Sequence, residues 1–135
     1  MDPLKVAMII NSPSYDRVAN ALSIATISAA HLKEVHVLFT YGAVCRLIKG
    51  KTDDVGEETD AWIRDEIISG LEKGSIQKVT KMITHLKGFG GKIYACSAAL
   101  TFHHLTQDDL IEEIDEVTGI STFLEKTENA EMLYI

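Results

Sequence analysis

The first third of the chain alternates between strand-type and helix-type sequence, and this alternation constrains the fold more than any other feature. Residues 4–10 (LKVAMII) are almost continuously apolar, which predicts a strand buried on both faces. Over 15–32, apolar residues recur at the spacing of one helical face. Residues 34–40 (EVHVLFT) return to a strand pattern. A strand, a helix and a second strand in so short a span predict a right-handed parallel crossover.

The same alternation continues to the end of the chain. Helical spacing and short apolar runs predict further elements in this order: helices at 43–49, 61–71 and 76–86, a strand at 93–95, a short helical segment from 98, a strand at 114–117, a helix at 118–125 and a strand at 132–135. Strands that alternate with helices predict helices on both faces of a sheet. We therefore expect an α/β fold with three α/β/α layers and a mainly parallel, flavodoxin-like sheet of about five strands.

Length, charge and hydropathy narrow the class of protein. The chain has 135 residues and 46% hydrophobic content, so we expect a single domain over 1–135 with one core. Its 13 Lys and Arg residues are outnumbered by 20 Asp and Glu residues, which argues against a nucleic-acid partner. The first residues show no signal-peptide pattern, and no apolar run reaches the roughly 18 residues of a membrane span. These observations predict a cytoplasmic protein without a membrane span.

The two cysteines, Cys45 and Cys96, lie far apart in the sequence and match no metal-binding or disulfide-framework spacing. In a reducing cytosol both are expected to be thiols. We expect neither a metal nor another cofactor. Cys45 follows the second predicted strand and is more typical of a packed helix residue than of a reactive one.

Cys96 has the more informative context, because it ends the predicted strand at 93–95. Ligands of open α/β sheets bind outside the carboxyl ends of the strands. Ser97 can cap a helix that begins at Ala98, which would place the thiol beside free backbone N–H groups and favour the thiolate. The alternative is that Cys96 is a buried small hydrophobe, as free cysteines often are.

Two further polar clusters have a structural and a functional interpretation. The acidic stretch 51–60 predicts a solvated surface loop rather than a metal site, because it lacks a rigid ligand spacing. His103 and His104 lie shortly after Cys96, where either one could hydrogen-bond or deprotonate the thiol. They could equally be exposed structural residues, and a Cys-His-His metal site would lack a fourth ligand.

Several stretches, taken together over almost the whole chain, resemble the DsrE/DsrF-like family of small sulfur relay proteins, to which TusD belongs. The most specific is the cysteine that follows Gly91-Lys92-Ile93-Tyr94-Ala95. The stretches that carry the resemblance are 5–10 with the alanine-rich helix that follows, 35–44, 91–96, 105–110 and 119–124. The resemblance implies a DsrE-like fold. Two other classes of this architecture fit less well, because 11–14 (NSPS) lacks the glycine of a flavodoxin phosphate loop and the acidic pair of a receiver domain.

The resemblance also implies a function. In the family, a cysteine placed like Cys96 accepts sulfane sulfur, as a persulfide or a thiosulfonate, and passes it to a small sulfur carrier protein. Backbone N–H groups of Ser97 and Ala98, with His103 and His104, would then bind the sulfur anion, such as thiosulfate. Family members are homo-oligomers or mixed hexamers, so a trimer or hexamer is implied. Whether sulfurtransferase turnover accompanies carriage stays open.

This chain departs from the family pattern in one respect, and a second interpretation of the fold follows. Some members carry a second cysteine about two helical turns beyond the first, whereas 97–109 contains none. A local two-cysteine mechanism is therefore not expected here. The alternative to a sulfur carrier is a non-catalytic oligomeric binding or regulatory module in which Cys96 is buried and unreactive.

Overall fold

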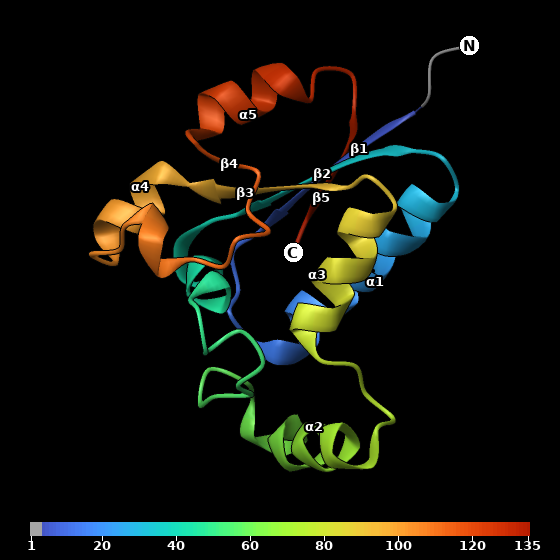
Figure 1. The fold of residues 1–135 in the computed structure, drawn as a ribbon, viewed down its shortest axis with the longest axis vertical. Coiled ribbons are helices and arrows are strands. Elements are labelled where there is room, and N and C mark those ends of the chain that lie inside the picture. Colours follow the sequence, from blue (N-terminus) through green and yellow to red (C-terminus); the bar gives the residue numbers. More distant parts are fainter. Residues whose placement is uncertain (1–3) are drawn as a thin grey trace.

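The computed structural model describes residues 4–135 and contains a five-stranded sheet between two helical layers (Figure 1). All strand pairs are parallel, in the order β4-β3-β2-β1-β5. The predicted three-layer α/β/α architecture is therefore confirmed. The elements in chain order are β1 (Lys5–Ile10), α1 (Tyr15–Ala30), β2 (Glu34–Phe39), the 3-10 helix η1 (Tyr41–Leu47), α2 (Ala61–Lys73), α3 (Val79–Gly88), β3 (Lys92–Cys96), α4 (Ser97–Phe102), the 3-10 helix η2 (Gln107–Asp109), β4 (Glu116–Thr118), α5 (Ile120–Lys126) and β5 (Glu131–Tyr134).

The strand order decides which loops meet at the carboxyl edge of the sheet. Strands β1 to β4 follow one another across the sheet, and β5 then pairs with the free side of β1. The flavodoxin order is different, because there the third strand pairs with the first. Here β3 lies between β2 and β4, with Phe39 beside Ala95 and Cys96 beside Thr118. The segments that follow β2, β3 and β4 therefore emerge side by side.

The two helical layers differ in extent. Helices α1 and α3 lie side by side on one face, and α5 lies on the other (Figure 1). On the α5 face, the ring of Tyr94 in β3 meets Phe123 with 5.4 Å between ring centroids. The core follows the predicted strands, since Ala7, Met8 and Val37 are fully buried. Among residues 4–135, no helix is both long enough and apolar enough to cross a membrane.

Several predicted elements differ from the structure in helix type or in their first residue. The segment after β2 forms the 3-10 helix η1 instead of two α-helical turns. The third helix begins at Val79 rather than after Ser75, because the N–H of Ser75 bonds the Gly70 carbonyl at 2.9 Å and completes the end of α2. Helix α4 begins at Ser97 itself, so its N-cap residue is Cys96 and not Ser97.

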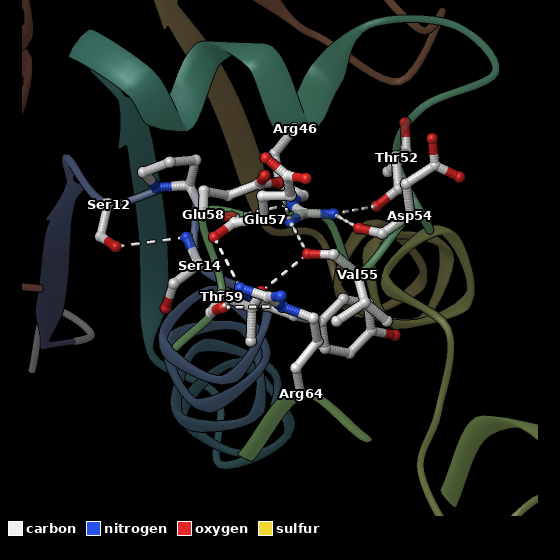
Figure 2. A network of polar contacts seen from close by, with 12 residues as sticks. Ser12, Ser14, Arg46, Thr52, Asp54, Val55, Glu57, Glu58, Thr59 and Arg64 are labelled. Atoms are coloured by element: carbon white, nitrogen blue, oxygen red, sulfur yellow. Dashed lines mark hydrogen bonds and ion pairs between the residues drawn. The ribbon is translucent and has the colours of Figure 1, made fainter. Parts of the chain in front are cut away.

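The acidic stretch 51–60 is held around one buried arginine (Figure 2). The Arg46 side chain is 2% exposed and its guanidinium pairs with the Glu58 carboxylate at 2.9 Å. It also donates to backbone carbonyls, those of Pro13 at 2.7 Å, Val55 at 3.2 Å and Asp54. A buried guanidinium needs such partners to offset its lost hydration. Asp54, Glu57 and Asp60 are exposed, as predicted for a surface loop. Asp53 instead accepts hydrogen bonds from Thr80, and the backbone of the stretch is ordered around Arg46.

Candidate functional site around Cys96

Strand β3 fixes the position of Cys96. Gly91, just before β3, lies so close to α3 that an added Cβ would stand 2.4 Å from the Leu86 Cδ1 atom, so this approach requires glycine. On the other side of the strand, the Asp115 carboxylate accepts a hydrogen bond from the Ile93 N–H at 2.7 Å. These contacts hold the start of β3, and the strand carries Cys96 to the carboxyl edge of the sheet.

The Cys96 thiol opens into a cavity of about 260 Å³. Side chains alternate between the two faces of a strand, so Cys96 lies on the same face as Tyr94, the face that α5 covers. The thiol is nevertheless buried, since Cys96 is only 3% exposed. Among residues 4–135, no charged side chain lines this cavity; its lining residues are Thr40, Tyr41, Cys96, Ala98, Ala99, Phe102 and Ile120.

The start of α4 adds backbone donors beside the thiol. Because Cys96 is the N-cap residue of α4, the N–H groups of Ser97 and Ala98 belong to the first turn, where intrahelical acceptors are missing. Ala98 lines the cavity, while Ser97 is exposed and lies outside the lining. The role of these two residues toward a sulfur anion stays a prediction.

The two histidines lie at the opposite end of α4. The Nδ1 atom of His103 is 3.7 Å from the Sγ atom of Cys45, and His104 is exposed with a φ of +57°. Neither histidine is among the residues that line the Cys96 cavity. The fold thus brings His103 to the other cysteine of the chain, Cys45. Substrate binding by His103 and His104 stays a prediction.

Cys45 has surroundings of its own. It is half-buried in η1 and borders a second cavity, together with Arg46, Lys51 and Glu58. Burial raises the pKa of the Cys45 thiol, and the negative charge of Glu58 raises it further. Cys45 therefore stays protonated at neutral pH, which disfavours it as a nucleophile.

Five of the residues that line the Cys96 cavity were not among the predicted site residues: Thr40, Tyr41, Ala99, Phe102 and Ile120. Thr40 and Tyr41 follow β2, the strand beside β3, so a known strand order would have singled them out. Ile120 and Phe102 carry no such signal. Within residues 4–135, no group of three or more His, Cys, Asp or Glu side chains is arranged to hold a metal ion.

The chain is similar to one known protein family and to solved structures. Residues 4–133 match the DsrE/DsrF-like family, and no curated protein matches the chain. The crystal structure of the ychN protein from E. coli is similar with a TM-score of 0.72 and 14% identity, over 98% of this chain and 99% of that one. The protein of unknown function MTH1491 from Methanobacterium thermoautotrophicum is similar with a TM-score of 0.62 and 18% identity, over 98% and 99% of the two chains. These two solved structures share the fold of this chain. The family match covers nearly the whole length of the chain and shows that this chain belongs to the DsrE/DsrF-like family.

Proposed function

We propose that this protein is a sulfur carrier that accepts sulfane sulfur on Cys96, as a persulfide or a thiosulfonate, and passes it to a partner carrier protein. Membership of a family associated with sulfur relay supports this proposal. The observation that carries it is the position of Cys96, at the carboxyl end of β3 and in the wall of a cavity. A thiol in such a place meets incoming ligands at the edge where open α/β sheets bind them.

The chemistry is a pair of thiol exchange reactions. The Cys96 thiolate attacks the outer sulfur of a donor persulfide, so that a new S–S bond forms on Cys96 while the donor S–S bond breaks and the donor leaves as a thiolate. An acceptor thiolate then attacks the outer sulfur on Cys96 and takes it, and Cys96 is released as a thiolate. Neither step needs an external oxidant or reductant. The backbone N–H groups of Ser97 and Ala98 would stabilise negative charge on the outer sulfur.

The partners are part of the same proposal. A small sulfur carrier protein would supply the acceptor thiol. A sulfur anion such as thiosulfate would be an alternative donor: the Cys96 thiolate attacks its outer sulfur, the S–S bond of thiosulfate breaks, and sulfite leaves. A thiosulfonate on Cys96 would form from tetrathionate in the same way, with thiosulfate as the leaving group. We also propose a homo-oligomer, a trimer or a hexamer, as the family resemblance implies.

A second candidate is a non-catalytic binding or regulatory module of the same fold. The low exposure of Cys96, 3%, favours it, because a thiol of this exposure is commonly a packed hydrophobe. The two candidates differ in one measurable property, the reactivity of Cys96.

Intact-protein mass spectrometry distinguishes them. The protein is incubated with a persulfide donor, thiosulfate or tetrathionate, beside the variants Cys96→Ser and Cys45→Ser. The carrier account predicts a reducible sulfur or thiosulfonate adduct that disappears in Cys96→Ser and persists in Cys45→Ser, with both variants folded by circular dichroism. Retained loading in Cys96→Ser would refute the assignment to Cys96. No adduct with any donor, together with slow alkylation, would favour the binding module.

A further inference from the structure

The cavity at Cys96 has a buried floor and an exposed rim. Cys96 and Thr40 are each 3% exposed, while three large lining side chains are open to solvent: Tyr41 is 67% exposed, Phe102 69% and Ile120 46%. The three belong to η1, α4 and α5, which lie far apart in the sequence. These three side chains, with exposed Ala98, therefore border the opening through which a molecule from solvent would reach the thiol.

Tyr41 differs from the other two rim residues in its backbone. Its φ is +44°, in the left-handed region where bulky L-residues are rare because Cβ crowds the following carbonyl. Glycine is the usual residue for such a position. Here the glycine stands one residue later, and Gly42 does not have a positive φ. The chain thus places an aromatic side chain where glycine would relieve the strain.

The neighbouring contacts hold Tyr41 in this conformation. The N–H of Thr40 donates to the Ile10 carbonyl at 2.9 Å. On the other side, the backbone of Gly42 packs on Pro13, where an added Cβ would stand 3.1 Å from the Cδ atom. Because both neighbours are fixed, the backbone of Tyr41 cannot relax without breaking these contacts.

The strain at Tyr41 has no compensation in core packing. With 67% of its surface exposed, Tyr41 contributes little to the core. Strained residues that the surroundings hold in place cluster at functional sites. We propose that Tyr41 determines the specificity of the Cys96 site: its ring, which lines the rim of the cavity, admits a sulfane sulfur at the end of a slim, unbranched arm and excludes bulky donors. This inference rests on the proposed function of Cys96.

The test compares how small and bulky reagents reach Cys96. In a Cys45→Ser background, rates of Cys96 modification are measured with iodoacetamide and with a fluorescein maleimide, and rates of sulfur loading with cysteine persulfide and glutathione persulfide. In Tyr41→Gly the rate with the bulky member of each pair should rise by about tenfold relative to the small member. Tyr41→Asn, which also tolerates a left-handed backbone, should behave in the same direction. Tyr41→Phe keeps the ring and should keep the original ratio.

Leu32→Gly is the matched control for strain. Leu32 has a φ of +65° and is 86% exposed, but it lies between α1 and β2 and does not line the cavity. Both glycine variants should keep or raise the thermal midpoint, while only Tyr41→Gly changes the ratio of bulky to small reagents. An unchanged ratio in Tyr41→Gly, or the same change in Leu32→Gly, would overturn the inference. If the unmodified protein takes up no sulfur, the proposed function fails, and the two alkylating reagents still decide whether Tyr41 controls access.

Discussion

A single buried residue, Arg46, connects segments that lie on both sides of it in the sequence. Arg46 sits one residue after Cys45, yet its guanidinium holds together the loop after β1 and the acidic stretch through the carbonyls of Pro13 and Val55. Glu58 supplies the opposite charge but is 39% exposed, against 2% for Arg46. Water screens the exposed side of this ion pair, so the hydrogen bonds from Arg46 to backbone carbonyls contribute more to stability than the ion pair does.

We expect Arg46→Ala and Glu58→Gln to differ strongly in stability. Arg46→Ala leaves buried carbonyls without donors and should lower the free energy of unfolding by about 3 kcal/mol. Glu58→Gln removes a partly solvated charge and should cost less than about 1 kcal/mol. Urea unfolding of the two variants measures both values. Equal losses in the free energy of unfolding would show that the ion pair with Glu58, and not the hydrogen bonds to the carbonyls, accounts for the stabilising effect of Arg46.

At the scale of elements, the neighbouring strands β2 and β3 share a buried polar pair on the α5 face. The Nδ1 atom of His36 is 2.7 Å from the Tyr94 hydroxyl, and Glu34 lies 3.4 Å from the His36 Nε2 atom. Burial lowers the pKa of His36, although the charge of Glu34 acts in the opposite direction. Burial also raises the pKa of Tyr94 to about 12. Both groups are therefore neutral at pH 7, as their position between sheet and helix requires.

The lowered pKa of His36 predicts a pH-dependent stability. The unfolded chain binds a proton at the usual histidine pKa of about 6.5, whereas folded His36 resists protonation, so stability falls as the pH drops below that value. Urea unfolding from pH 7.5 to 5 should show a smaller loss in His36→Asn than in the unmodified protein. Parallel profiles for the two proteins would contradict this prediction. His31→Asn serves as the matched control, because His31 is exposed and takes no part in the contacts of His36 with Tyr94 and Glu34.

At the scale of the whole molecule, the sequence predicts individual helices and strands well, but it does not predict which distant segments meet in the fold. The run that ends at Cys96 is a strand because its apolar pattern and the preceding Gly91 are local signals. Strand order is a non-local property, so the meeting of Tyr41, Phe102 and Ile120 at one cavity could not be predicted from spacing. The same limit applies to His103, because its place 3.7 Å from the Cys45 Sγ atom depends on tertiary packing and not on its distance from either cysteine in the sequence.

The central claim is that sulfur passes through Cys96, and one labelling measurement tests it most directly. The protein is loaded from a persulfide that carries heavy-isotope sulfur, freed of excess donor and mixed with an acceptor thiol protein, and peptide mass spectrometry follows the label with time. The account predicts that the label first lies on the Cys96 peptide and then moves to the acceptor as Cys96 returns to the free thiol. A label that stays on Cys96, or that is found on Cys45 instead, would contradict the account.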